Sequence, residues 1–389
     1  QYCADRGMEK KGNVPVVYII TKLELGGAQK VCLSLFQELQ KKDHLTFLIS
    51  GCEGPLVQDV QEKPGVFLIP SFIRECSWRT LGKEIKTFFS LIRILRTLQA
   101  KHPDLIVHTH STKAGYLGRW AAFFSGISQR MHTVHGFGFH EHQSYPVYGI
   151  AYLLEFITSF ITTHYICVST KDMHTGCRLL PRFYKKNFLI RAAVQENHFM
   201  PAIAFKNKYE TPEFTFGTVS CFKKQKNLFD LLSAFKEVHA LHPRARLEII
   251  GDGLLKPNII AWIHQHNLND YITLHGWVHN VAPLMRHWNV FVMSSLWEGL
   301  PCAAVEARFL KLPVLAYNVG GLSELIQSHK NGFLYEPCNI LDLRNGMISL
   351  LTDKVLYKKL KEHTEDLSSF TINAMLVQHN LLYRSMIKK

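Results

Sequence analysis

Glutamates in a mostly apolar part of the chain are the first candidates for chemistry. Glu298 and Glu306 lie on either side of a Gly-Leu-Pro turn at residues 299–301, and Glu324 follows a Gly-Gly pair further on. Carboxylate oxygens accept hydrogen bonds from hydroxyl groups. This spacing therefore predicts a site for a polyhydroxyl compound, with one carboxylate for a sugar and another for a ribose.

The turn between Glu298 and Glu306 also suits an anion. An apolar strand is expected at 290–295, and Pro301 is expected to begin a helix, because proline is favoured at the first helical position. The first N–H groups of a helix have no partner within it and attract phosphate. A phosphate is therefore expected beside Glu298.

Glycines and lysines elsewhere are placed for the same chemistry. Gly26 and Gly27 separate the first expected strand from its helix, where they let the backbone approach a ligand closely. Lys223, Lys224 and Lys226 follow a strand and precede a helix, so one of them could meet a diphosphate. The alternatives are an ordinary Gly-rich turn and, for Lys223 and Lys224, a solvated run of charge.

Four histidines end two neighbouring strands. His108 and His110 close one strand, and His132 and His135 close the next. They could carry protons, donate hydrogen bonds to a sugar or phosphate, or simply pack inside the protein. No metal is expected, because neither carboxylates nor cysteines accompany them at ligand spacing and the chain has no Asp-x-Asp pair.

The elements that position these residues alternate between strand and helix. Apolar runs typical of buried parallel strands lie at 14–20, 44–50, 66–70, 104–110, 130–136, 165–169, 187–191, 215–220, 246–253, 271–277, 290–295 and 312–318. Helical patterns lie between them, at 28–42, 81–103, 114–126 and 228–242. This alternation predicts an α/β protein.

Length and a polar stretch indicate two domains. The 389 residues exceed what one compact core usually holds, and a polar linker near 197–213 interrupts the alternation. We predict two doubly wound Rossmann-like domains that face each other across a cleft, with the first at 1–196. Ligands of such sheets bind beyond the carboxyl ends of the strands.

The net charge of +14 lies mainly in the first half of the chain. Residues 1–195 carry 24 Lys and Arg against 14 Asp and Glu, and the rest carries 21 against 17. A basic surface could meet nucleic acid, an anionic membrane or an anionic substrate. Nucleic acid is not expected as a partner, because no binding module and no basic surface interleaved with aromatics is recognised.

Cysteines and apolar runs bear on location. The nine cysteines are an odd count without Cys-x-x-Cys, which favours a reducing, cytoplasmic compartment, and no signal peptide is expected. The apolar segment 145–169 holds Glu155 near its middle, which favours a buried helix and a strand over a membrane-spanning helix. The basic helix at 83–101 could lie on the inner face of an anionic membrane, although an ordinary domain helix is the favoured interpretation.

In this order, these motifs resemble those of the family-4 retaining glycosyltransferases, which have the GT-B fold. The most specific element is the Glu-x7-Glu pair, Glu298 and Glu306, in SSLWEGLPCAAVEA. The segments GGAQK, VHTHSTKAGYLGRWAA and HTVHGFGFH resemble motifs of the first domain, the last two those of the subgroup that builds bacterial polysaccharides and lipid-linked glycans. The terminal helix, 373–389, resembles one that crosses back to the first domain, so the second domain is expected at 197–372.

The resemblance implies a role for each site residue. The donor would be a UDP- or GDP-sugar. Its diphosphate would contact Lys226, its ribose Glu306 and its base the backbone around Gly276. Its sugar would contact Glu298 and the backbone N–H groups of Gly299 and Leu300. From the first domain, His135 and the Gly26–Gly27 loop would meet the sugar and the phosphates. Glu298 and His135 are the catalytic candidates, and no metal or other cofactor is implied. The protein would mainly position the reactants and stabilise the departing diphosphate.

Two positions depart from the family pattern. Ser220–Cys221 stands where the family has Gly-Arg, so a phosphate-binding arginine is missing, and Lys223 or Lys224 is the candidate substitute. Ala192–Ala193 replaces an interdomain Asn-Gly turn.

The resemblance predicts a metal-independent, retaining hexosyltransferase with a glycan or lipid-linked acceptor in cell-surface polysaccharide synthesis. The alternatives are a GT-B nucleotide-sugar epimerase, which the Glu-x7-Glu spacing disfavours, a phosphorylase, for which the chain is short, and a basic nucleic-acid-binding protein.

Overall fold

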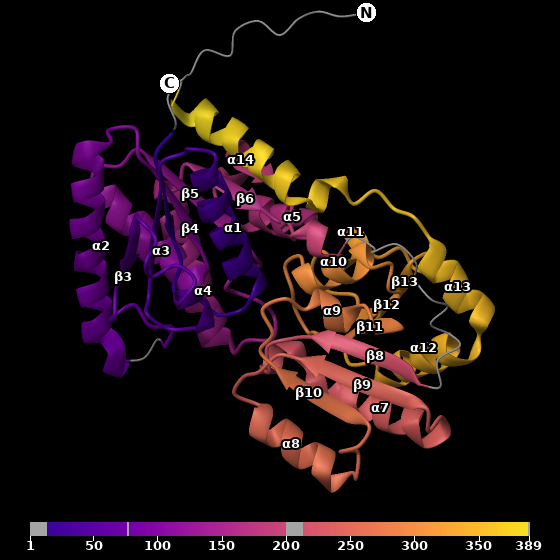
Figure 1. Cartoon of the computed structure of the whole chain (residues 1–389). Coiled ribbons are helices and arrows are strands. Elements are labelled where there is room, and N and C mark those ends of the chain that lie inside the picture. Colours follow the sequence, from indigo (N-terminus) through magenta and orange to yellow (C-terminus); the bar gives the residue numbers. More distant parts are fainter. Residues whose placement is uncertain (1–13, 76–77, 200–212, 388–389) are drawn as a thin grey trace, which may run out of the picture.

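The computed structural model describes residues 14–75, 78–199 and 213–387. Two α/β domains lie side by side (Figure 1), each built on a sheet whose paired strands are all parallel. Parallel strands need crossover helices, which cover the sheet and leave it buried. The predicted fold class is confirmed.

The first domain contains, within the described residues, a seven-stranded sheet in the order β3-β2-β1-β4-β5-β6-β7. Its strands are β1 (Val16–Ile19), β2 (Thr46–Ser50), β3 (Val66–Leu68), β4 (Ile106–His110), β5 (Gln129–Val134), β6 (His164–Cys167) and β7 (Asn187–Leu189). Its helices are α1 (Gly27–Lys41), α2 (Leu81–Lys101), α3 (Thr112–Phe124), α4 (Tyr145–Ile161) and α5 (Thr170–Leu179).

The second domain contains, in the part of the chain that is described, a six-stranded sheet in the order β10-β9-β8-β11-β12-β13. Its strands are β8 (Phe214–Val219), β9 (Ala245–Ile250), β10 (Ile272–Gly276), β11 (Val290–Met293), β12 (Val314–Tyr317) and β13 (Gly332–Tyr335). The α-helices that follow α5 in the chain are α6 (Glu196–Phe199), which precedes β8, and α7 (Leu228–Leu241), α8 (Lys256–Gln265), α9 (Ala282–Met285), α10 (Cys302–Phe309), α11 (Leu322–Leu325), α12 (Ile340–Thr352), α13 (Lys354–Glu362) and α14 (Ile372–Ile387).

The central strand β1 shows why its run is apolar throughout. Val16 and Tyr18 point into the core that contains α1, whereas Val17 and Ile19 point into the core that contains α2 and α3. Successive side chains of a strand alternate between the two faces. Because both faces are covered, every residue of β1 is buried, and the strand cannot show the polar alternation of a half-exposed sheet.

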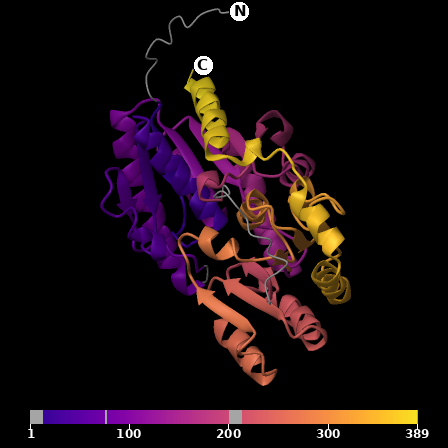
Figure 2. The same cartoon turned by 45° about the vertical axis from the view of Figure 1, so that its right-hand side comes forward.

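The last helix, α14, returns to the first domain (Figures 1 and 2) and packs against α1. The Tyr383 hydroxyl lies 2.7 Å from Nδ1 of His108 and 3.1 Å from the hydroxyl of Tyr18. The Gln129 side chain donates to the backbone oxygen of Met386 at 2.9 Å. The predicted crossing back of the terminal helix is therefore confirmed.

The structure differs from the sequence-based expectations at two elements. Strand β13 was not among the predicted strands. Helix α4 was predicted to be buried, but it exposes a row of apolar side chains, so that prediction was wrong for its outer face. Among the described residues, no helix is long and apolar enough to cross a membrane.

The boundaries at 196 and 372 stay predictions. The last strand of the first sheet ends at Leu189, and the first strand of the second sheet begins at Phe214. Residues 200–212, most of the predicted linker, lie outside the described residues.

Candidate active site

A cleft of about 850 Å³ lies between the domains, at the carboxyl ends of strands from both sheets. Eight of the nine predicted site residues line it: Gly26, Gly27, His135, Lys226, Glu298, Gly299, Leu300 and Glu306. The ninth, Gly276, does not, although its neighbour Trp277 does. Gly276 has a φ of +69°, and its carbonyl accepts a hydrogen bond from the Gly251 N–H at 2.8 Å.

Lys226 and Glu298 form an ion pair inside the second domain. Lys226 ends a short 3-10 helix after β8, and Glu298 lies in the turn after β11, which is the neighbouring strand of the sheet. The side chains are only 18% and 8% exposed. Residues predicted to bind the diphosphate and the sugar are thus in contact, as the two parts of one donor require.

A second pair joins the two domains. Lys30, one turn into α1, lies 3.2 Å from Glu306 in α10. The Glu306 carboxylate raises the pKa of Lys30, so the lysine is firmly charged. Lys30 stood in the quoted GGAQK motif, but no role was assigned to it, because a partner 276 residues away leaves no local signal.

Glu24 forms ion pairs with three basic residues at another part of the cleft. Its carboxylate contacts Lys22 at 2.5 Å, Arg74 at 3.5 Å and, from the second domain, Lys223 at 3.2 Å. Burial raises the pKa of Glu24, but Lys22 and Lys223 outweigh it and hold the pKa below the usual value. Lys223 is therefore an interdomain contact, whereas Lys224 is exposed. Neither Glu24 nor Arg74 was among the site residues predicted from the sequence.

Glycines allow the backbones of three loops to meet. A Cβ on Gly299 would lie 2.7 Å from the backbone of His135, and one on Gly320 would lie 2.3 Å from the carbonyl oxygen of Glu298. The Gly321 N–H donates to the Gly299 carbonyl at 2.6 Å. Such distances exclude any side chain, since backbone atoms cannot move aside as flexible side chains do. The His135 loop and the Glu298 loop therefore touch directly across the cleft.

The third glutamate, Glu324, does not line this cleft and ties the domains together. Its Oε1 accepts a hydrogen bond from the Thr170 N–H at 2.8 Å, in the first turn of α5. Its Oε2 lies against Arg191 as an ion pair without hydrogen-bond geometry. Glu324 is thus an interdomain contact, which answers why a carboxylate follows the Gly-Gly pair.

Three of the four histidines pack inside the first domain. His108 is held by Tyr383 and, at 2.6 Å, by Thr133, while His132 lies 2.9 Å from the hydroxyl of Thr109. His110 is fully buried, and its Nδ1 lies 3.0 Å from Nε2 of His135. The packing alternative is therefore correct for His108 and His110; His132, also buried, lines the edge of the cleft.

His135 is the histidine placed for chemistry. The residue is partly exposed and lines the cleft, yet protein atoms surround its ring, and this burial, followed by the nearby His379, lowers its pKa to about 4. At neutral pH it is uncharged, so it can exchange hydrogen bonds with a ligand but adds no positive charge.

Positive charge exceeds negative charge in the cleft. Its lining contains seven Lys and Arg side chains and four glutamates: Lys22, Lys30, Arg74, Lys113, Lys223, Lys224, Lys226, Glu24, Glu155, Glu298 and Glu306. Cys221, at the position of the missing arginine, also lines it, and burial raises the pKa of its thiol, which stays neutral. Within the described ranges, no group of His, Cys, Asp or Glu is arranged to hold a metal ion, and the absence of a metal cofactor stays a prediction.

Two parallel α/β domains that meet across a basic cleft, with a helix returning from the second to the first, are the architecture of the GT-B glycosyltransferases. Solved structures agree. The Anabaena protein HepE, crystallised with UDP and glucose, has a TM-score of 0.79 at 16% identity over 96% of this chain and 100% of that one. Sucrose-phosphate synthase from Thermosynechococcus elongatus has a TM-score of 0.80 at 20% identity, over 97% and 100% of the two chains.

Sequence comparison places the chain within a family. Residues 25–179 match the family described as Glycosyltransferase Family 4, and residues 200–367 match Glycosyl transferases group 1. The Escherichia coli UDP-Gal:alpha-D-GlcNAc-diphosphoundecaprenol alpha-1,3-galactosyltransferase is 32% identical over 345 residues, which cover 85% of this chain and 86% of that protein. The capsular polysaccharide glycosyltransferase CapM of Staphylococcus aureus is 24% identical over 71% of this chain and 75% of its own. The chain belongs to this glycosyltransferase family and is a glycosyltransferase.

Proposed function

We propose that the protein transfers a sugar from a UDP-sugar to a lipid-linked diphosphate glycan, with retention at the anomeric carbon. The observation that carries this proposal is the meeting of the Lys226–Glu298 and Lys30–Glu306 pairs in one basic interdomain cleft. A nucleotide sugar has an anionic diphosphate between two polyols, and the cleft offers lysines between carboxylates. The donor class fits the ligands of HepE, and the acceptor class fits the name of the E. coli relative.

Each residue has a physical task in this reaction. Lys226 neutralises charge that develops on the departing diphosphate, which lowers the barrier most in a site with little water. Glu298 accepts hydrogen bonds from the transferred sugar, and Glu306 accepts them from the ribose. Lys30 holds the Glu306 carboxylate in place from the other domain, so the ribose contact is complete when the domains are together.

The missing arginine is compensated, in this proposal, by lysines that the cleft already contains. Lys223 reaches the cleft from the β8 end and is held beside Glu24. A neutral Cys221 thiol adds no charge, so the diphosphate depends on Lys223 and Lys226.

A lipid-linked acceptor would bring the protein to a membrane. We therefore propose peripheral contact with an anionic membrane at its cytoplasmic face, in the synthesis of a cell-surface polysaccharide. UDP-galactose, the donor in the name of the E. coli relative, is the first donor to try.

Thermal unfolding with and without nucleoside diphosphates tests the donor site. A ligand at a hundredfold excess over its Kd stabilises the native state by about 2.7 kcal/mol. We expect UDP, but not ADP, to raise the Tm of the wild type, and Glu306→Ala to abolish the shift. Because Glu306→Ala also leaves Lys30 unpaired, each variant is compared with its own ligand-free Tm.

The matched control is Glu298→Gln. It should keep the UDP shift, since Glu298 is assigned to the sugar, but lose transfer to a GlcNAc-diphospholipid. A wild type that shows no shift with UDP or GDP, or that transfers no sugar to such a lipid, would contradict the proposal. NMR of the anomeric proton of the product tests retention.

A further inference from the structure

Helix α4 buries its polar residues, together with part of the aromatic residues Tyr152 and Phe156, and exposes most of its other apolar residues. Glu155, Thr158 and Ser159 are buried against the rest of the first domain. The apolar side chains on the opposite face are exposed: Tyr145, Val147, Ile150, Leu153, Leu154, Ile157 and Phe160. A surface helix of a globular protein normally has the reverse arrangement. This outer row follows helical spacing, so it forms one continuous stripe.

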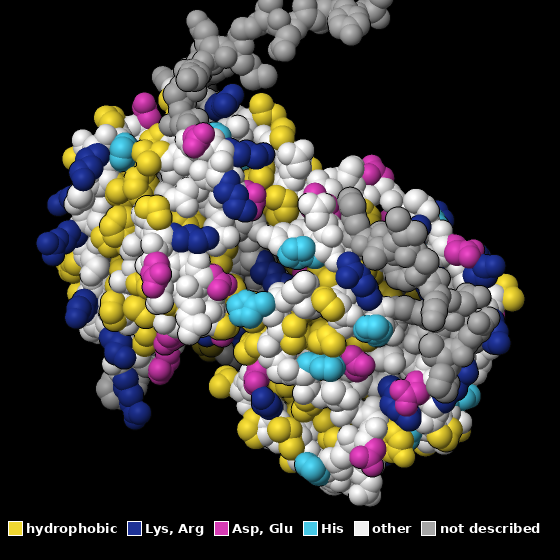
Figure 3. Space-filling view, in the orientation of Figure 1, with side chains coloured by type: hydrophobic (Ala, Val, Ile, Leu, Met, Phe, Trp, Pro, Cys, Tyr) yellow, Lys and Arg dark blue, Asp and Glu magenta, His cyan; other side chains and the backbone are white. Residues whose placement is uncertain are grey.

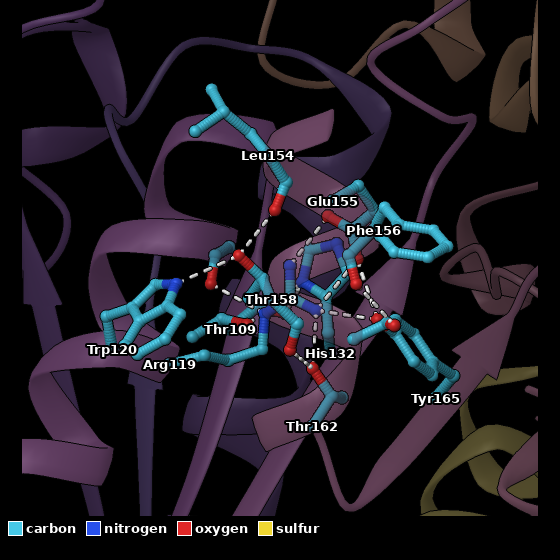
Figure 4. A network of polar contacts seen from close by, with 12 residues as sticks. Thr109, Arg119, Trp120, His132, Leu154, Glu155, Phe156, Thr158, Thr162 and Tyr165 are labelled. Atoms are coloured by element: carbon cyan, nitrogen blue, oxygen red, sulfur yellow. Dashed lines mark hydrogen bonds and ion pairs between the residues drawn. The ribbon is translucent and has the colours of Figure 1, made fainter. Parts of the chain in front are cut away.

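A polar network fixes α4 in this orientation (Figure 4). The guanidinium of Arg119 in α3 donates to both carboxylate oxygens of Glu155 at 2.8 Å, and the Tyr165 hydroxyl donates to the same carboxylate at 2.8 Å. The Trp120 ring N–H donates to Thr158 at 3.0 Å. Turning α4 over would leave the buried Arg119 without its counter-charge, which is strongly unfavourable. The apolar stripe must therefore face outward.

The exposed apolar surface continues beyond α4. Helix α3 packs between α2 and α4, and it exposes Phe123 and Phe124 at its end. Phe89 of α2 is 63% exposed, and its neighbour Phe88 contacts the ring of Phe124. Contiguous apolar patches of this kind mark interaction sites. We call the exposed apolar residues of α2, α3 and α4 the outer apolar face.

The exposed charges on the part of the chain that contains α2, α3, α4 and α5 are mostly positive. Between residues 81 and 188, the exposed basic residues are Lys83, Lys86, Arg93, Arg96, Lys101, Lys171, Arg178, Arg182 and Lys185, whereas the exposed acidic residues are Asp104 and Glu141. Figure 3 shows Lys and Arg side chains along the outer edge of the first domain, beside hydrophobic ones. Helix α5 and the turn after it are tied to α4 by the Tyr152 hydroxyl, which donates to the Leu179 carbonyl at 3.0 Å. Basic residues thus lie on α2, which packs against α3, and on α5 and the turn after it, which contact α4.

We propose that the outer apolar face, centred on α4, docks the protein on an anionic phospholipid bilayer. An apolar stripe bordered by Lys and Arg is the composition of a helix that lies in the membrane interface. Anionic lipid attracts the basic border, whereas a second copy of this chain would bring two basic surfaces together. The inference rests on the proposed function in one respect, the lipid-linked acceptor.

The docked orientation places the cleft at the membrane. Gly138, His140 and Gln143 line the cleft, and α4 begins two residues later with Tyr145, which is 93% exposed. A bilayer in contact with α4 would lie beside the cleft mouth. A diphosphate at the lipid surface could then enter the site while its chain stays in the membrane.

Sedimentation with vesicles tests this inference. The wild type should bind vesicles of phosphatidylcholine and phosphatidylglycerol in equal amounts, and more weakly those of phosphatidylcholine alone. The variant Ile150→Ser, Leu153→Ser, Ile157→Ser should reduce binding by at least about tenfold. The matched control, Leu254→Ser with Val355→Ser, changes residues of the second domain that are 88% and 80% exposed and should bind as the wild type does.

The basic border has its own test. Arg178→Gln with Arg182→Gln should weaken binding to the anionic vesicles by about fivefold for each residue removed, and this loss should shrink at high salt. Equal binding of the α4 variant and the wild type, or no vesicle binding at all, would overturn the inference. So would self-association of the wild type that the α4 variant loses, since the stripe would then be an interface between copies.

Two further measurements separate this inference from the proposed function. The UDP-induced Tm shift and transfer to a water-soluble short-chain acceptor depend on the cleft alone. If both fail while vesicle binding depends on α4, the proposed function is wrong and the docking surface stands. If both succeed and vesicle binding fails, the docking surface is wrong.

Discussion

Glu324 provides a test of how the two domains are held together. Its carboxylate receives the Thr170 N–H at 2.8 Å and forms the ion pair with Arg191, and the two charged side chains are 13% and 18% exposed. Exposed pairs contribute up to about 1 kcal/mol, whereas removing one partner of a fully buried pair costs about 3–5 kcal/mol. For this partly buried pair we expect Glu324→Gln to lower the free energy of unfolding by about 2 kcal/mol.

Urea unfolding of the single variants Glu324→Gln and Arg191→Gln and of their combination gives the coupling energy between the two side chains. We expect a coupling energy of about 1–2 kcal/mol between the two side chains. In the variants, the unfolding of one domain should depend less on the unfolding of the other than it does in the wild type. Glu237→Gln is the matched control, because its 2.6 Å pair with Arg344 lies within the second domain with side chains 52% and 27% exposed. It should change stability by less than about 0.5 kcal/mol. Strictly additive single variants would show that Glu324 and Arg191 are neighbours without an energetic link.

Three further predictions follow from contacts in the structure. Glu155→Gln leaves the buried Arg119 guanidinium without its counter-charge, so we expect urea unfolding to show a free energy of unfolding lower by about 3–5 kcal/mol. The double variant Arg119→Met/Glu155→Met should recover part of this loss. An unchanged urea midpoint of Glu155→Gln would contradict the buried pair. Gly299→Ala would place a Cβ 2.7 Å from the His135 backbone and should lower kcat/KM for transfer more than tenfold. The control Gly82→Ala, which has open space around its Cβ, should leave kcat/KM unchanged, and equal activities of the two variants would rule out the close loop contact. Burial lowers the pKa of His135 and of His379 to about 4, so the unfolded chain binds more protons than the folded one between pH 6.5 and 4. As the pH decreases through that window, the free energy of unfolding should therefore fall by about 1.4 kcal/mol per pH unit for each histidine. The variant His379→Leu should reduce this slope, and an unchanged slope would contradict a neutral buried His379.

Much of the fold and of the site could be predicted from local sequence patterns. Apolar runs and helical periodicity are properties of neighbouring residues, so they indicated the two parallel sheets without knowledge of any contact. The Gly-Leu-Pro turn between Glu298 and Glu306 is equally local, and both glutamates line the cleft. The departure at Cys221 was also visible in the sequence, as a residue type out of place in a motif.

Only the tertiary structure decided which charged groups meet. Lys30 and Glu306 are 276 residues apart, and Thr170 and Glu324 are 154 apart, so no spacing rule connects them. The local sequence around a histidine at the end of a strand does not show whether the side chain faces a ligand or the protein interior. His108 faces the interior because α14 returns to the first domain and places Tyr383 beside it.

The orientation of α4 shows the same limit for burial. Its sequence determines one apolar face and another face that mixes polar residues with aromatic ones, but not which of them points inward. That choice depends on the buried Arg119 of α3, whose charge requires Glu155 beside it. The sequence by itself thus determined the elements and the chemistry at the strand ends. Pairing across the cleft and the face offered to the surroundings were decided by contacts between distant segments, because burial and ion pairing depend on what packs nearby.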